Sequence, residues 1–400
     1  MQISEQDLAV QDEDRFDRFR LISWWDQKRL ASARVVVIGA GALGNEITKN
    51  LALLGIGHVL IADMDRIENS NLSRSVLYRE CDNGQYKAQI AARAAAEVYP
   101  GIKAEAFTGN IVYDLGLGAF RWADVVIAGL DNREARLHVN RACWKLNKPW
   151  IDGAIEAIDG TARVFVPDGP CYECTMSETD WKLLRARRSC NLLSRSQMEQ
   201  GKTPTTPTIS SIIAGIQCQE AVKLLHGMES FGGKGIVFNG LSADSYQIEY
   251  QRRDDCYSHD TLGQVVPLGA GAETITLGAI LDKARQILGS DAQIEFGRDM
   301  LEKLMCPTCR REEAMFVSLG KVRSEQAICP HCPGVRREPV TFYKLRGDEA
   351  ILERTPAQIG LPAFDIIIAR KGSRAIGLEL DADAPQVLKS LWAEDGLEFE

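Results

Sequence analysis

The sequence Arg34-Val-Val-Val-Ile-Gly-Ala-Gly-Ala-Leu-Gly44 decides how the first half of this chain folds. Its apolar residues Val35 to Ile38 are typical of a buried parallel strand. The glycines that follow, with G-x-G-x-x-G spacing, are Gly39, Gly41 and Gly44. They permit a tight turn, a close approach of the backbone to a phosphate, and close packing of the next helix on the strand. Backbone N–H groups at the start of that helix would then bind a nucleotide phosphate.

The residues after this turn predict the sheet that carries it. A second apolar strand, His58 to Ala62, ends at Asp63, a carboxylate placed to bind ribose hydroxyls. Further strands are expected near residues 103–107, 124–129, 150–154 and 161–166, with helical segments between most of them. This order predicts an α/β fold with a Rossmann-like, mixed but largely parallel sheet and helices on both faces. The alternative for the turn is a strand-to-helix connection that binds no ligand.

The composition restricts where the protein works. With 400 residues the chain has room for two or three domains, and its net charge of −8 argues against a broad nucleic-acid or anionic-membrane surface. No apolar run is long enough to span a bilayer, and the polar N-terminus lacks a signal-peptide pattern. We therefore expect a cytoplasmic protein that binds neither membrane nor nucleic acid.

Charged and polar residues gather where strands of the predicted sheet end, which is where open α/β sheets bind ligands. The loop after Asp63 contains Asp65, Asn71 and Arg74. Lys87 begins the next helix, where a cation opposes the helix dipole unless an anion binds there; the alternative is a solvated lysine. Asp131 and Asn132 follow a later strand, and Asp131 is either a Mg²⁺ ligand or an ordinary helix N-cap.

Most of the eleven cysteines lie in C-x-x-C-type pairs, which in a reducing compartment indicates zinc rather than disulfides. One pair combines with a downstream C-x-x-H to give a closed tetrahedral site, the alternative being free thiols and a surface histidine. Two later pairs, separated by 19 residues, have the spacing of a zinc ribbon. The ligands expected for two Zn²⁺ ions per chain are Cys171, Cys174, Cys256 and His259, and Cys306, Cys309, Cys329 and Cys332.

The chain is expected to divide into two domains. Residues 1–262 form the first, with a long basic loop at about 178–206 and the first zinc site; residues 263–272 are a Gly- and Ala-containing linker. Residues 273–400 form a small α+β domain that contains the zinc ribbon. Because we expect this domain to have little core of its own, loss of its zinc should unfold it.

Taken in order, these motifs resemble the ThiF/MoeB/ubiquitin-activating-enzyme superfamily, over more than half of the chain. The matching segments are Arg15-Phe-Asp-Arg18, the glycine turn, Asp63-Met-Asp65, Asn71-Leu-Ser-Arg74, Lys87, Asp131-Asn132 and the first zinc ligands. The resemblance implies that ATP and Mg²⁺ are used to adenylate the C-terminal glycine of a ubiquitin-like protein. Phe19 and Ser75 depart from the pattern, since many members have glutamine at these two positions.

The resemblance also implies roles for single residues. Arg74 and Lys87 surround the phosphates with positive charge, Asp131 holds Mg²⁺ and Asp63 holds the ribose. Arg18 resembles the family's arginine finger, supplied by the other subunit of a homodimer. The residues implied to contact the nucleotide are Gly39, Gly41, Gly44, Asp63, Asp65, Asn71, Arg74, Lys87, Asp131 and Asn132.

A zinc ribbon, rather than a rhodanese-like active-site loop, follows residue 260, which disfavours a fused sulfurtransferase. The basic loop carries Cys190 beside two arginines that favour its thiolate, and it resembles the family's crossover loop. We therefore expect a thioester on Cys190 and transfer of the modifier to a carrier (conjugating) enzyme, with a bystander thiol as the alternative. Cys81 is a weaker rival, whereas Cys143 and Cys218 are expected to be packed in helices.

Four other functions are alternatives to activation of a ubiquitin-like protein through a thioester. Two belong to the same superfamily: adenylate-only activation of a sulfur-carrier protein, and a tRNA threonylcarbamoyl-adenosine dehydratase-like activity. An NAD-dependent oxidoreductase also begins with G-x-G-x-x-G, but it would give Arg74, Lys87 and Asp131 no purpose. A non-enzymatic scaffold protein, held together by zinc and with an inactive nucleotide site, is disfavoured because Arg74, Lys87 and Asp131 are all present.

Overall fold

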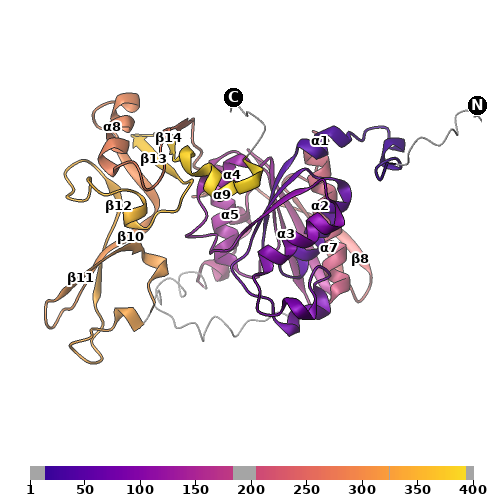
Figure 1. The fold of residues 1–400 in the computed structure, drawn as a ribbon, viewed down its shortest axis with the longest axis horizontal. Helices are drawn as coiled ribbons and strands as arrows, with labels where there is room; N and C mark the ends of the chain where they lie inside the picture. The colour runs from indigo at the N-terminus through magenta and orange to yellow at the C-terminus, as the bar shows by residue number, and fades with distance from the viewer. Residues whose placement is uncertain (1–13, 183–203, 324, 393–400) are drawn as a thin grey trace, which may run out of the picture.

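The computed structural model describes residues 14–182, 204–323 and 325–392, and these form two sheets (Figure 1). The first sheet has the strand order β3-β2-β1-β4-β5-β6-β7-β8. Its strands are β1 (Arg34–Ile38), β2 (His58–Ala62), β3 (Lys103–Phe107), β4 (Val125–Ala128), β5 (Trp150–Glu156), β6 (Asp159–Phe165), β7 (Lys234–Asn239) and β8 (Asp244–Glu249). The first five strands in this order, β3-β2-β1-β4-β5, pair in parallel. The remaining neighbours, from β5 through β6 and β7 to β8, pair antiparallel, so the sheet is mixed.

Helices cover both faces of this sheet, which confirms the Rossmann-like prediction. The helices are α1 (Gln27–Ser32), α2 (Ala42–Leu54), α3 (Lys87–Val98), α4 (Leu117–Trp122), α5 (Arg133–Lys145) and α7 (Pro207–Leu225). Alternate residues of β1 enter different cores: Val35 and Val37 pack with α2, α3 and α7, whereas Val36 and Ile38 pack with α4 and α5. A central strand that is apolar on both faces is what the run Val35 to Ile38 required.

The order of the strands places a topological switch point at the carboxyl end of β1, and the region between the loops that diverge there is called the crevice below. Strand β1 pairs with β2 on one side and with β4 on the other. The helix that follows β1 and the helix that follows β4 lie on opposite faces, so the loops at the carboxyl ends of these two strands diverge. Open α/β sheets bind ligands at such a switch point. Asp63 and Asp131 follow strands on the two sides of it.

The second sheet has the order β11-β10-β13-β14-β9, and β12 also pairs with β10. Its elements are β9 (Val265–Pro267), α8 (Leu277–Leu288), β10 (Gln293–Met305), β11 (Glu312–Ser318), β12 (Glu338–Leu345), β13 (Ile366–Lys371) and β14 (Arg374–Glu379). Strand β9, which lies within the stretch expected to be a linker, pairs in parallel with β14. We therefore propose that the domain boundary falls just before β9.

The second sheet has a substantial core, and the expectation of little core was wrong. Buried apolar residues from α8, β10, β13 and β14 form one cluster, which includes Leu281, Ile294 and Leu378. The zinc-ribbon end has a separate and much smaller buried cluster of Leu301, Leu304 and Val322. Burial of apolar surface therefore stabilises most of this region independently of the ribbon.

The C-terminal part of the chain is packed against the first sheet. Helix α9 (Ala384–Leu388) buries Ala384 and Leu388 in the same apolar cluster as Phe120 of α4, and the two helices lie together in Figure 1. The Asp365 carboxylate accepts a hydrogen bond of 2.9 Å from the Leu117 N–H, so it caps α4 from outside. Within the described residues, no helix combines the length and apolarity needed to cross a membrane.

Candidate active site and metal centres

The three glycines of the β1–α2 turn have three different environments. Gly39 has φ of +91°, and a Cβ there would lie 2.6 Å from the Gly129 carbonyl oxygen at the end of β4. A Cβ on Gly44 would lie 1.8 Å from the carbonyl oxygen of Gly39, so only glycine fits at either position. A Cβ on Gly41 would meet no atom within 4 Å. Gly39 and Gly44 thus serve the turn and its packing, whereas Gly41 borders open space where a ligand can approach.

The start of α2 is suited to an anion. Gly41 is the N-cap residue and offers no side chain to the first N–H groups of the helix. Those N–H groups lack carbonyl partners within the helix and carry its positive partial charge. A phosphate placed beside Gly41 would accept hydrogen bonds from these N–H groups and would be attracted by their positive partial charge.

Two buried residues that the sequence analysis missed hold this turn in place. The Asn45 side-chain amide donates to the Ala40 carbonyl at 2.9 Å, and its Oδ1 accepts from the Leu77 N–H at 2.9 Å. The Tyr78 hydroxyl donates to the same Ala40 carbonyl at 2.6 Å. These bonds tie the glycine turn to the loop that precedes Lys87. No sequence signal singled out Asn45, because Glu46 and Thr48 of the same helix are polar and buried as well.

Asp63 also binds the turn. Its Oδ2 accepts from the Ala40 N–H and its Oδ1 from the Asp65 N–H, each at 2.7 Å. Burial raises the pKa of Asp63, and Lys87 and these two N–H groups offset part of that rise. The carboxylate therefore orients both the glycine turn and the loop that carries Asp65.

Lys87 is not a solvated lysine. Its side chain is only 13% exposed, and its Nζ donates to Asp65 Oδ2 at 2.9 Å, whereas Asp65 is 57% exposed. The ammonium is thus held at the edge of the crevice by a carboxylate that faces solvent. An incoming phosphate could share or replace this partner at little desolvation cost to Lys87.

Asn71 and Arg74 lie in a 3-10 turn, Asn69–Arg74, between Asp65 and Lys87. Asn71 Oδ1 accepts from the Glu68 N–H at 3.0 Å, which fixes the start of the turn. Arg74 Nη1 donates to the Ser70 carbonyl at 2.8 Å. Arg74 is half-buried and its neighbour Ser75 is buried, so this end of the turn packs against the rest of the fold.

Asp131 is not the N-cap of α5. That position belongs to Asn132, whose Oδ1 accepts from the Ala135 N–H at 2.8 Å. The Asp131 carboxylate is exposed and accepts a bond of 3.3 Å from the Asn132 side chain. It follows Gly129, the residue that touches Gly39, by two positions, so it lies on the β4 side of the crevice.

Arg18 lies away from this crevice. Phe16, two positions before Arg18, packs against Tyr99, with ring centroids 5.4 Å apart, beside Gly55 at the end of α2. Arg15 donates to the Val98 carbonyl at the end of α3. Because α2 has 13 residues, its two ends are about 20 Å apart. The fold therefore does not bring Arg18 to the glycine turn of its own chain.

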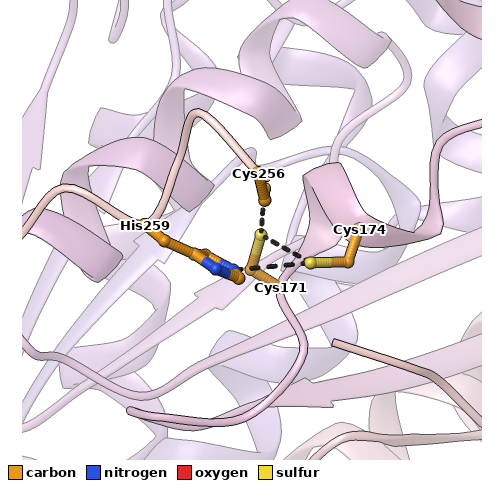
Figure 2. Close-up of side chains that lie close together, drawn as sticks. All are labelled: Cys171, Cys174, Cys256 and His259. Carbon is orange, nitrogen blue, oxygen red and sulfur yellow. Dashed lines mark hydrogen bonds between the residues drawn. The ribbon is translucent and has the colours of Figure 1, made fainter. Parts of the chain in front are cut away.

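The first predicted zinc set forms a compact cluster, drawn in Figure 2. Cys171 Sγ lies 3.7 Å from Cys174 Sγ and 3.6 Å from Cys256 Sγ, and Cys174 Sγ lies 3.4 Å from His259 Nε2. A disulfide would need sulfur atoms about 2.05 Å apart. Three thiolates about 2.3 Å and an imidazole nitrogen about 2.0–2.1 Å from one Zn²⁺ would lie at the spacing observed here. The set therefore fits a tetrahedral zinc ion.

Helix α5 orients both halves of this cluster. Asn140 accepts from the Tyr172 N–H at 2.8 Å and donates to Ser258 Oγ at 3.0 Å, and the Ser258 hydroxyl donates to Glu173. The indole of Trp144 stacks on His259, with ring centroids 4.0 Å apart. Such partners fix the direction of the ligands around a metal.

The second predicted set also forms a cluster. The thiols of Cys306, Cys309, Cys329 and Cys332 lie within 4.8 Å of one another. Cys309 Sγ is 3.8 Å from Cys329 Sγ, and the Cys309 N–H donates to Cys306 Sγ at 3.5 Å. His331 lies outside this set and hydrogen-bonds Arg311 at 2.8 Å, as expected of a residue that is not a ligand. Four thiolates at this spacing fit a zinc ribbon.

We predict two zinc ions per chain and a local effect when the second is lost. In Cys306→Ser/Cys332→Ser, metal analysis should find one zinc, and hydrogen exchange should accelerate only around Leu301, Leu304 and Val322. Helix α8 and strands β13 and β14 should keep their protection because their apolar core is separate. Wild-type protein without two zinc ions, or loss of protection throughout α8, would contradict this prediction.

The cysteine predicted to form a thioester, Cys190, lies outside the described residues, as does most of its loop. Of its rivals, Cys143 is buried and burial raises its pKa, and burial raises the pKa of Cys218 to about 12. Both were expected to be packed, and this is confirmed. Cys81 is exposed, so it remains the rival to be tested.

Comparison with known proteins gives one family. The ThiF family model matches residues 14–258. A SAMP-activating enzyme E1 of Haloferax volcanii is 31% identical over 241 residues, covering 58% of this chain and 81% of that protein. A sulfur carrier protein adenylyltransferase of Thermus thermophilus is 32% identical over 237 residues, covering 58% and 83% respectively.

A solved structure shares the fold. The crystal structure of Escherichia coli MccB with ATP superposes with a TM-score of 0.53 at 23% identity, covering 64% of this chain and 77% of that one. At this identity the likeness shows the fold alone. It supports the same Rossmann-like arrangement that β1 to β5 display.

Proposed function

Because the chain belongs to the ThiF family, we propose that it uses ATP to adenylate the C-terminal glycine of a ubiquitin-like protein. The observation that carries this proposal is the crevice itself. The glycine turn borders open space at Gly41 and is hydrogen-bonded to the segment between Arg74 and Lys87, and Asp131 follows the strand on the other side. The names of the two relatives, one activating a SAMP and one adenylating a sulfur carrier protein, point to the same class of substrate.

The chemistry explains this set of residues. A carboxylate is a poor electrophile, so its oxygen first attacks the α-phosphorus of ATP; the bond to the β-phosphate bridging oxygen breaks and pyrophosphate leaves. Negative charge accumulates on the phosphates during this step, and stabilising it is usually the largest catalytic contribution. The N–H groups at the start of α2 would hold one phosphate, and Arg74 and Lys87 would supply positive charge. Asp63 and Asp65 would accept from the ribose hydroxyls.

Asp131 fits a magnesium ion that is shared with the nucleotide. Mg²⁺ is usually held by one or two carboxylates together with substrate phosphates and water. Asp131 is an exposed carboxylate beside the crevice and does not cap its helix. When bound, the ion would neutralise charge on the phosphates.

We predict that Asp131→Ala lowers ATP–pyrophosphate exchange by roughly a hundredfold or more, because the phosphate clamp loses its anchor. The assay uses candidate small β-grasp proteins that end in glycine as substrates. Asp282→Ala, an exposed carboxylate on α8, is the matched control and should behave as wild type. Exchange in Asp131→Ala within a few-fold of wild type would show that Asp131 does not have this role.

We further propose that Arg18 acts in the crevice of a second subunit. One adenylation half is present in this chain, and Arg18 lies at the end of α2 remote from its own glycine turn. A homodimer would allow each Arg18 to reach the partner's phosphates.

Mixing subunits tests this arrangement. Arg18→Ala and Asp131→Ala homodimers should each be inactive, whereas a mixture that exchanges subunits should recover up to about a quarter of the wild-type activity, because some hybrid crevices have both residues. Absence of recovery despite proven subunit exchange, or full activity in a monomer by light scattering, would reject action across a dimer.

The finer proposal is that the modifier passes to Cys190 as a thioester and then to a carrier enzyme. Supporting it are the two arginines beside Cys190 in the sequence and the burial of Cys143 and Cys218. The alternative is adenylate-only activation of a sulfur carrier, which the name of the Thermus thermophilus relative favours.

We predict that Cys190→Ala still catalyses pyrophosphate exchange but forms no reductant-sensitive adduct with the modifier, because only the second step needs a thiolate. Gel electrophoresis with and without thiol is the measurement, and Cys81→Ala is the control that should retain the adduct. An adduct in Cys190→Ala, or none in wild type, would place the enzyme in the adenylate-only branch.

A further inference from the structure

A buried cluster of charges lies beneath the Asp131 loop, between α5 and the sheet. Asp152 of β5 is fully buried, and its carboxylate lies between two guanidinium groups. Its Oδ1 accepts from Arg136 Nε at 2.8 Å, and its Oδ2 accepts from Arg163 Nε at 2.9 Å. Asp152 pairs in register with Arg163 of β6, so both side chains project from the same face of the sheet toward α5.

The other end of Arg136 reaches the backbone of the crevice. Its Nη2 donates to the Leu130 carbonyl and, at 3.1 Å, to the Gly153 carbonyl. Leu130 is the residue immediately before Asp131. A single guanidinium thus joins the carbonyl that precedes Asp131 to two positions on β5.

The residue after Asp131 is fixed as well. Asn132 caps α5 by accepting from the Ala135 N–H. The backbone of Asp131 is therefore held on both sides, by Arg136 before it and by the helix cap after it, while its carboxylate is exposed. Rigid backbone beneath an exposed carboxylate is the arrangement that a shared metal site needs, because small displacements of a ligand weaken its contribution.

Stability alone is a weak reason for this cluster. Buried ion pairs often contribute no more to stability than apolar residues of similar size, because removing charges from water is costly. The guanidinium is required for its geometry, since it has donors in a fixed planar array that a lysine lacks.

We propose that Arg136 is a positioning residue that holds Asp131 in place for the magnesium–nucleotide complex, and that Asp152 orients Arg136. This inference rests on the proposed function. Arg136 is not proposed to contact the nucleotide or the metal. It acts on Asp131 by holding the carbonyl of Leu130, the residue before it.

Calorimetric titration of ATP into the full chain, with Mg²⁺ and with EDTA, tests the proposal without relying on turnover. Wild type should bind ATP more tightly with Mg²⁺. Arg136→Lys should keep its affinity in EDTA within about twofold but lose about tenfold or more of the gain that Mg²⁺ provides, as expected when the support of a metal ligand is removed. Asp152→Asn, which keeps the shape of the side chain, should show the same loss to a smaller degree.

Arg121→Lys is the matched control. Arg121 of α4 pairs at 2.8 Å with the buried Glu379 of β14, away from the crevice. This variant should lower the melting temperature while leaving the Mg²⁺-dependent gain unchanged. It separates a general loss of stability from a specific effect on Asp131.

The outcomes distinguish failure of the positioning role of Arg136 from failure of the proposed function. An undiminished Mg²⁺ gain in both Arg136→Lys and Asp152→Asn, or an equal loss of ATP affinity with and without Mg²⁺, overturns the positioning role and leaves the proposed function standing. If Arg136→Lys does not fold, Asp152→Asn alone decides. A wild-type protein whose ATP binding is independent of Mg²⁺ overturns both proposals.

Discussion

The close approach of Gly39 to Gly129 is the constraint on which the crevice depends. No side chain fits between the carboxyl ends of β1 and β4, so the two backbones touch there. This contact places the start of α2 beside the loop after β4. Asp63 after β2, Asn45 of α2 and Tyr78 before α3 then hydrogen-bond the Ala40 peptide. The glycine turn is therefore held in place by the fold itself, so little ordering entropy would oppose binding of the proposed phosphate.

Features with local causes were predictable from the sequence. The run Val35 to Ile38 and the glycine spacing were sufficient for the sheet and its turn, because strand burial and positive φ impose residue types directly. The two side-chain clusters that could hold zinc were predictable because C-x-x-C-type spacing is itself a geometric requirement of such sites. Whether Asp131 caps its helix or serves as a Mg²⁺ ligand was left open, and the structure gives the cap to Asn132.

Features that depend on distant contacts were not predictable. Asn45, Tyr78 and Arg136 act through carbonyl groups, which carry no sequence signal. The core of the second sheet was underestimated because its residues come from strands and a helix spread over more than one hundred positions, from Leu277 to Leu380. The position of Arg18 at the far end of α2 follows from the packing of Phe16 on Tyr99, a pairing that periodicity does not reveal.

The packing of α9 on α4 has a consequence for biosynthesis. Leu388 joins other C-terminal residues in an apolar cluster whose remaining members, such as Phe120 of α4, belong to the first sheet and the helices on its face. The face of that sheet covered by α4 and α5 therefore stays partly open on the ribosome until residues near 390 have emerged. A nascent chain would expose this apolar surface during the synthesis of the whole second sheet, which makes it a target for chaperones.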